Sequence, residues 1–480
     1  MSARHQSATA RSAGTASAAL LAILALGGAT RLSAQVGSGA VINLLADDDP
    51  TLRGEAALIA AAQRAPGARD AIRKLLADRD ESVRARAILA LGILAAAGAD
   101  AELGPRLADR EAPPIVRHAA AYALGCLPDD QPAPSIDRYL DRAEGGSRRR
   151  HRDTLAALLA GLLRTPHSLR LAQVESLLHD ASLKDPGLLV LALRAQRHCG
   201  GTLDDADFDR MIAIRDTTLR VAAIESVAFA PTAADPEVLA VIRGLADRDA
   251  DPKVRAAVIA ALAAHGRDAA MHTLLREALA SDDVRQVEAA TRALASFDDD
   301  AARAAVSDRV RSTSDIVVQR AILRGWRGTP TTAILAAARA FGARPDASAA
   351  DQALGLRVLA AAHEADARTR AVDFARHGTD PALVADALAE LVALDRDADL
   401  RAALAVDAEG AFVRLPVHIE ALGRVDRALA SALADRALAD PAASAATRRG
   451  LVTAWRRALW SPPPVEVLAA LPEDLAALLR

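Results

Sequence analysis

A short pattern recurs along this 480-residue sequence, and it limits the possible folds more than any other feature. Its clearest copy is Asp251-Pro252-Lys253-Val254-Arg255-Ala256-Ala257, with Leu262 following. Other copies begin at Asp49, at Glu81 and at Pro114. Self-similarity at a period of roughly 20–50 residues is typical of repeat architectures, in which similar small units stack in a row.

A Val or Leu at the centre of each clear copy serves as a marker, and the markers are evenly spaced. Neighbouring markers lie 29 to 36 residues apart, although the copies at 152, 287, 354, 417 and 448 are degenerate. Alanine contributes 120 of the 480 residues, but that composition does not by itself produce such even spacing. The markers are residues 52, 83, 116, 152, 188, 219, 254, 287, 318, 354, 383, 417 and 448.

Each unit is predicted to contain two helices, as residues 236–266 illustrate. Pro236 opens a first helix that Asp235 can cap, and Pro252 opens a second helix with Asp251 as its cap. Gly266 ends the second helix. The predicted buried stripe of the first helix is Val238, Leu239, Val241, Ile242 and Leu245. The predicted stripe of the second helix is Val254, Ala257, Val258, Ala261 and Leu262.

Neither helix of a unit can bury its stripe alone, so neighbouring units must stack to bury the stripes together. Only 2% of the residues are aromatic, which predicts a core of many small Leu, Val and Ala contacts. We therefore predict an all-α superhelix, an α-solenoid of about 12–13 two-helix repeats over residues 35–460, shaped as one long curved rod. Residues 461–480 are predicted to form a Pro-rich turn and a capping helix.

The pattern Asp-Pro-x-Val-Arg-x-x-Ala, with Leu and Gly closing the second helix, resembles HEAT repeats. It is most similar to the short bacterial repeats that are also called phycobilisome-lyase-type repeats. The resemblance covers roughly residues 40–460 and is clearest at Val83, Val116 and Val254. It implies a solenoid that binds other proteins, usually on the concave face lined by the second helices.

The resemblance also implies a ladder of ion pairs between repeats, formed by a turn aspartate and an arginine of the second helix. Leu189 and Val384 stand at two of the arginine positions, so the ladder should be interrupted there. The residues that match by position are Asp80, Asp216 and Asp251 with Arg84, Arg220 and Arg255.

The first 34 residues have the features of a signal peptide. Arg4, His5 and Arg11 give a modestly positive start, and an apolar run from Ala18 to Gly28 follows. This run is shorter than the ~20 residues that a membrane-spanning helix needs. We expect cleavage near Ala34–Gln35 and a periplasmic or secreted protein, with an uncleaved anchor or a disordered tail as the alternative.

Charge and hydropathy restrict the partner. The net charge is −3, and the first 34 residues contain three arginines and no acid, so the remainder is more acidic still. A mildly acidic chain argues against nucleic acid as the main partner, because phosphate binding requires a basic excess. No stretch after the signal segment is apolar for long enough to span a membrane. We expect a protein partner of unknown identity and a monomeric chain.

Sequence motifs for catalysis or metal binding are absent. The sequence contains no His-Glu-x-x-His, Cys-x-x-Cys, Gly-x-Ser-x-Gly or phosphate-loop motif. A zinc site would need ligands from separate repeats. Cys126 and Cys199 fall in repeats that are not neighbours and are predicted to be buried thiols. We therefore predict no catalytic residue, no cofactor and no metal.

Alternating aspartates suggest a calcium loop but lack its other residues. Residues 247, 249 and 251 are all Asp, as are 395, 397 and 399. An EF-hand loop needs Gly at its sixth position and Glu at its twelfth, where this chain has Pro252 and Val258 in the first case. We interpret both sets as turns with helix caps.

A basic run and three tryptophans complete the candidate binding residues. The run Arg148–Arg152 could bind phosphate groups or an acidic partner, but we interpret it as a solvated loop and helix start. Trp326 is predicted to lie in the core. Trp455 and Trp460 would either cap the open end of the solenoid or anchor a partner.

Three functions are compatible with these observations. The favoured one is an exported, non-catalytic scaffold for protein–protein interaction. The others are an enzyme similar to the phycobilisome lyases, which attach pigments to cysteine, and an envelope protein that spaces other components without a discrete site.

Overall fold

The computed structural model describes residues 38–480 apart from 96–97, 132, 144–150, 166–169, 229–235, 250, 267–268, 298, 363–414, 424–425, 441–442 and 461. The predicted signal segment and the marker at residue 383 therefore lie outside the described residues. The described part holds 25 helices and no strand, which confirms the predicted all-α superhelix. None of its helices is long and apolar enough to cross a bilayer.

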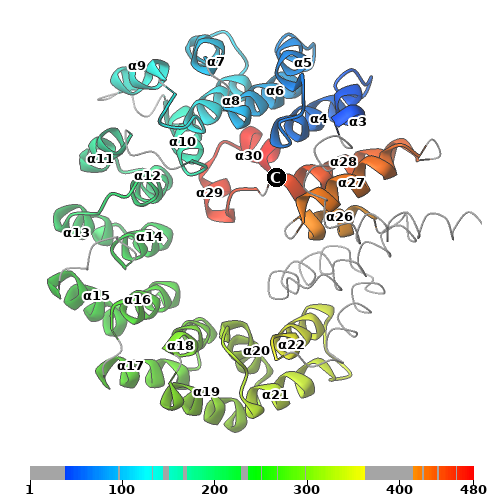
Figure 1. The fold of residues 1–480 in the computed structure, drawn as a ribbon. Coiled ribbons are helices and arrows are strands. Elements are labelled where there is room, and N and C mark those ends of the chain that lie inside the picture. The colour runs from blue at the N-terminus through cyan, green and yellow to red at the C-terminus, as the bar shows by residue number, and fades with distance from the viewer. Residues whose placement is uncertain are drawn as a thin grey trace, which may run out of the picture.

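The helices form an inner and an outer row around a common centre (Figure 1). The inner row is α4 (Pro50–Ala62), α6 (Glu81–Leu94), α8 (Pro114–Gly125), α10 (Arg152–Leu162), α12 (Pro186–His198), α14 (Thr217–Ala228), α16 (Pro252–His265), α18 (Val284–Phe297), α20 (Ile316–Gly325), α22 (Ala349–Ala361), α26 (Leu415–Gly423) and α28 (Ala445–Leu459). The outer row is α3 (Ser38–Leu44), α5 (Ala68–Leu75), α7 (Ala99–Ala108), α9 (Pro134–Ala143), α11 (Leu171–His179), α13 (Asp205–Ala213), α15 (Pro236–Arg248), α17 (Ala269–Ala280), α19 (Asp300–Ser312), α21 (Thr332–Gly342) and α27 (Arg427–Leu438). Each of the twelve described markers lies in a different inner helix, so the predicted register is confirmed.

Local capping explains where the inner helices begin. Asp251 accepts a hydrogen bond from the backbone N–H of Lys253 at 2.9 Å, and Gly266 ends α16 as predicted. The same role is played by Asp49, Asp80, Asp185 and Asp315 in other repeats. A carboxylate at this position satisfies an N–H group that the helix itself leaves without a partner.

The predicted stripes are correct for α16 but not for all of α15. Val254, Val258, Ala261 and Leu262 are buried, whereas Ala257 is only partly so. Val241 is 46% exposed, although the sequence places it in the buried stripe of the first helix. Its neighbour Ile242 is buried, because an outer helix covers only the narrow side that faces its inner partner.

The glycines that close the second helices allow the inner row to pack tightly. A Cβ added to Gly125 would lie 2.5 Å from the carbonyl oxygen of Leu158 in the next inner helix. A Cβ added to Gly325 would lie at the same distance from the carbonyl oxygen of Glu288. Any larger residue would force the two backbones apart, which explains why the pattern places glycine here.

The two ends of the stack meet, so the predicted open rod is wrong. The last inner helix, α28, packs against the first, α4, and the described helices lie in a circular arrangement, which we call the ring (Figure 1). Arg448 pairs with Asp47 at 3.1 Å, and Arg449 pairs with Asp49 at 3.0 Å across this junction. Small rotations between repeats add up along a solenoid, and their sum decides whether the ends meet.

A buried ion cluster lies at the centre of the junction. Nε of Arg456 in α28 lies 2.8 Å from Oε2 of Glu55 in α4. Nε of Arg86 in α6 lies 3.4 Å from Oε1 of the same carboxylate. The contact of Arg456 with Glu55 is an ion pair without an aligned hydrogen bond. The cluster therefore depends on charge attraction between three side chains from three helices.

The C-terminal segment lies inside the ring. It forms α29 (Val465–Ala470) and α30 (Glu473–Leu479), which contact the inner faces of α12 and α8 (Figure 1). Trp455 is fully buried and donates a hydrogen bond to Ser431 Oγ at 3.0 Å. Trp460 is also buried, beneath the guanidinium of Arg164 at 5.3 Å. Neither tryptophan covers an open end, because α4 occupies that position.

Candidate interaction surface

Arginines near the start of the inner helices bridge consecutive repeats, as the resemblance implies, but their partners differ from those expected. Asp80, Asp216 and Asp251 cap their own helices, so their carboxylates accept backbone N–H groups. The bridges instead join Arg53 to Asp78, Arg152 to Asp185, Arg220 to Asp249, Arg255 to Asp283 and Arg320 to Asp351. Arg84 donates to the backbone carbonyls of Asp78 and Arg79.

These bridges fix the inner row, and the bridge of Arg320 to Asp351 also favours the charged form of its carboxylate. Hydrogen bonding from Arg320 holds the pKa of Asp351 below its ordinary value, although burial opposes this shift. The two side chains meet at 2.8 and 2.9 Å in a bidentate contact. A bidentate guanidinium–carboxylate pair also fixes orientation, so the ladder sets the geometry of the concave face.

The C-terminal helices show how the concave face binds a helical segment. Glu466 in α29 lies 3.7 Å from Arg194 in α12, and Asp474 in α30 lies 3.3 Å from Nδ1 of His118 in α8. One side of both helices is apolar and buried, whereas Val465 at the start of α29 is exposed. The buried residues are Val467, Leu468, Leu475, Ala476, Leu478 and Leu479. The occupant is thus an amphipathic segment with acidic residues at its polar edge.

The contact of Arg194 identifies a helical position that faces the centre of the ring. Arg194 is the ninth residue of α12, and it meets a helix that lies inside the ring. In α4, α6 and α8 the ninth residues are Leu58, Leu89 and Tyr122, all fully buried. In α14, α16, α18 and α20 the ninth residues are Glu225, Ala260, Arg292 and Arg324, and the last three are exposed.

The concave face therefore has two chemically different halves. The half formed by α4–α12 is mainly apolar, apart from His118 and Arg194, and holds the C-terminal helices. Among the described residues, the half formed by α14–α20, which we call the exposed half, makes its main contacts with adjacent helices of the two rows. Lys253, Arg285, Arg292 and Arg324 are exposed there, and Glu288 pairs with Arg292. Ile316 and Val317 add an apolar patch, because they are 36% and 49% exposed.

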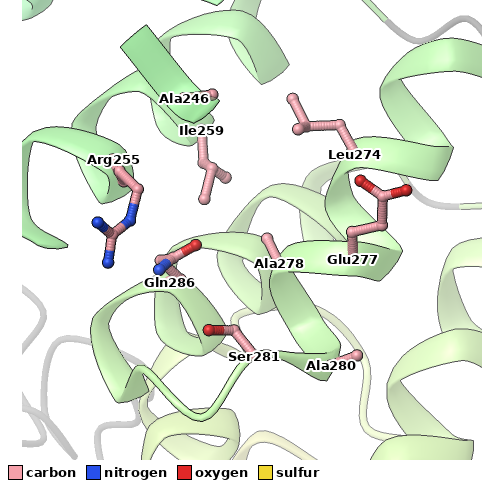
Figure 2. Close-up of a pocket in the computed structure, with 9 residues that line it drawn as sticks. All are labelled: Ala246, Arg255, Ile259, Leu274, Glu277, Ala278, Ala280, Ser281 and Gln286. Atoms are coloured by element: carbon pink, nitrogen blue, oxygen red, sulfur yellow. The ribbon is translucent and has the colours of Figure 1, made fainter. Parts of the chain in front are cut away.

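A cavity of about 450 Å³ separates two consecutive repeats within this half. Figure 2 shows Arg255 and Gln286 on one side of it and Leu274 and Glu277 on the other. With its amide oxygen turned toward Arg255, Gln286 accepts hydrogen bonds from that guanidinium at 3.1 and 3.3 Å. The charge of Arg255 is paired with Asp283 at 3.4 Å, so the cavity suits an apolar side chain better than an anion.

Comparison with known families agrees with the two-row geometry and the recurring pattern. A family model described as HEAT repeats matches residues 39–125 and 209–295. These two regions are HEAT repeats. The narrower likeness to phycobilisome-lyase-type repeats stays a prediction, because the matching model is the general one.

Comparisons with individual proteins add little. No curated protein matches this HEAT-repeat chain. A crystal structure of an engineered protein from the Northeast Structural Genomics Consortium is 16% identical, covering 87% of this chain and 98% of its own. Its TM-score is 0.26, and a likeness of that size carries no structural or functional argument.

The remaining residues singled out in the sequence have structural roles where the structure describes them. Asp249 and Asp251 belong to the ladder and to a helix cap, as predicted for the first set of alternating aspartates. The second set, at 395, 397 and 399, lies outside the described residues. Both cysteines are buried, as predicted, and burial raises the pKa of the Cys126 thiol to about 12.

The described part of the basic run and Trp326 also have structural roles, as interpreted from the sequence. Arg152 pairs with Asp185 at 3.1 Å and with Asp153 at 2.9 Å, and the ring of His151 contacts Tyr139 edge-on. The rest of the run, 148–150, is outside the described residues. Trp326 is buried in the HEAT-repeat core. Sequence reasoning missed the exposed half, because only the position of α29 reveals that the ninth residue faces inward.

Proposed function

We propose that this HEAT-repeat protein is an exported, non-catalytic scaffold that binds a partner protein on the concave face of its ring. HEAT repeats commonly form protein-interaction scaffolds, and solenoids of this kind use their concave surfaces for binding. The observation that carries the proposal is the position of α29 and α30. The chain's own tail shows which kind of segment this face accepts.

The partner we propose presents an amphipathic helix with an acidic edge. Residues 462–480 contain Glu466, Glu473 and Asp474 against one basic residue, Arg480. In the exposed half, Arg292 and Arg324 stand at the position that Arg194 uses to contact Glu466. Ile316 and Val317 offer apolar contact beside them. Opposite charges placed this way speed association and fix the register of a bound helix.

A labelled peptide of residues 462–480 tests this proposal with a defined probe. We expect it to bind the full-length chain, and we expect the double variant Arg292→Glu/Arg324→Glu to weaken binding at low salt. A tenfold loss corresponds to about 1.4 kcal/mol, a reasonable sum for two reversed surface contacts. Fluorescence anisotropy gives the dissociation constant for each variant.

Two control variants make this result specific. Arg311→Glu changes an exposed arginine of the outer helix α19, so it should leave the dissociation constant unchanged. An equal loss from that variant would show attraction to net charge alone. Loss from Arg194→Glu, with none from the double variant, would place the peptide in the tail's own position and contradict the exposed half as a binding surface.

Export is the second part of the proposal and rests on the first 34 residues alone. Their positive start, apolar run and small residues before Gln35 support recognition by an export machinery. We expect N-terminal sequencing of the protein isolated from its native cells to begin at or near Gln35. A mature chain that still begins at its first residues and is recovered with the cytosolic fraction would refute export.

A further inference from the structure

Three potential metal ligands from two consecutive outer helices meet at one point. His179 is the last residue of α11, and Asp204 and Asp207 are the N-cap and third residue of α13. Nε2 of His179 lies 3.4 Å from Oδ2 of Asp204 and 3.4 Å from Oδ2 of Asp207. All three ligand atoms lie within 4.8 Å of one another. It is the one such group among the residues that the structure describes.

The spacing of these atoms fits a small divalent metal. The point in their plane that is equidistant from all three lies at most about 2.4 Å from each, given two 3.4 Å separations and a third of at most 4.8 Å. Bond lengths of Zn²⁺ to histidine nitrogen and carboxylate oxygen are about 2.0–2.2 Å. The ligand atoms are thus already near the distances that coordination would impose.

The two carboxylates are held so that one oxygen of each is directed to the shared point. Oδ1 of Asp204 accepts the backbone N–H of Asp207 at 2.7 Å. Oδ1 of Asp207 accepts the guanidinium of Arg210 at 2.6 and 3.1 Å. Metal-ligating carboxylates are typically oriented by hydrogen bonds of this kind to their second oxygen.

Asp207 supplies an independent indication of a missing partner. The residue is only 6% exposed, and its Oδ2 is buried without a hydrogen-bond partner in the structure. The 3.4 Å contact with His179 is too long for a good hydrogen bond. A buried carboxylate oxygen without a hydrogen bond destabilises the folded chain, and a cation at the shared point would remove that cost.

The ligand types select the class of metal. An imidazole with two carboxylates suits Zn²⁺ and related transition metals, whereas Ca²⁺ requires six to eight oxygens and Mg²⁺ favours oxygen ligands with water. His179 and Asp204 are more than half exposed, so solvent can supply the remaining ligand. We propose that His179, Asp204 and Asp207 bind one Zn²⁺ ion, which clips the end of α11 to the start of α13.

Calorimetric titration of Zn²⁺ into the full-length, chelator-treated chain tests the site. We expect one ion per chain, and we expect His179→Ala to weaken binding by at least roughly tenfold because it removes one of three protein ligands. The Co²⁺-loaded wild-type chain should show the absorption bands of a coordinated ion, and the variant should lose them. His179 is 57% exposed, so this substitution should leave the fold intact, and circular dichroism checks that it does.

His272→Ala is the matched control. His272 lies 3.5 Å from a single carboxylate, Asp299, at an otherwise similar junction of two outer helices. The His272→Ala variant should bind Zn²⁺ as tightly as the wild-type chain does. The proposal is overturned if the wild-type chain binds no Zn²⁺ at millimolar concentration. It is equally overturned if His179→Ala binds as tightly as His272→Ala.

Discussion

Replacing Glu55 with alanine is expected to destabilise the folded chain by about 3–5 kcal/mol and to open the ring. Glu55 is buried between Arg456 and Arg86, so its removal leaves two cations without their counter-charge. Burial already lowers the pKa of the Arg456 guanidinium despite the attraction of Glu55. Losing the carboxylate removes the attraction that offsets the burial of Arg456.

Two measurements follow this change at the junction of α4 and α28. Chemical denaturation reports the free energy of unfolding, and small-angle X-ray scattering reports the radius of gyration, which should increase as the ends separate. The control is Arg449→Ala, which breaks an exposed pair with Asp49 at the same junction. An exposed pair contributes roughly 0–1 kcal/mol, so this variant should keep the wild-type radius. Equal, small effects of both variants would show that the buried cluster does not hold the ring.

Replacing Val254 with aspartate is expected to cost at least about 4 kcal/mol of folding free energy. Val254 is fully buried in α16, where the new carboxylate would have no water and no cation. Asp251 lies one turn earlier in the same helix, so the two negative charges would also repel each other. The expected result is a large fall in the denaturation midpoint measured by circular dichroism.

Val241→Asp is the comparison for this experiment. The sequence pattern places Val241 in the buried stripe of the preceding helix, yet the side chain is 46% exposed. Its replacement should change the free energy of unfolding by roughly 0.5 kcal/mol or less, as is usual for surface sites. If Val241→Asp were as harmful as Val254→Asp, the described orientation of α15 would be incorrect.

These two valines show how far the sequence predicts the fold. Asp251, Pro252 and Gly266 act through their own backbone neighbourhood, so the bounds of α16 follow from local chemistry. Periodicity alone does not say how wide the covered side of an outer helix is, and Val241 was misplaced for that reason. The arginine ladder was predicted in kind, but Arg84 and Arg220 take partners that depend on the rotation between repeats.

Ring closure and the candidate metal site depend on features that no short motif records. The junction of Glu55 with Arg456 joins residues 401 positions apart and results from rotations summed over every repeat. His179 and Asp207 come from different repeats, so their meeting requires the stacking distance as well as the sequence. The three-residue spacing of Asp204 and Asp207 is that of an ordinary helix cap, so it does not predict a metal site.

Closure also changes how the molecule can come apart. In an open solenoid a terminal repeat has a single neighbour, so unfolding can begin at either end by losing one interface. Here α4 packs against both α6 and α28, so the first inner helix has a neighbour on each side. Detaching the first repeat therefore means breaking contacts on both of its flanks together. A chain built from weakly coupled units would in this way be protected from fraying at its first and last repeats, which should unfold together.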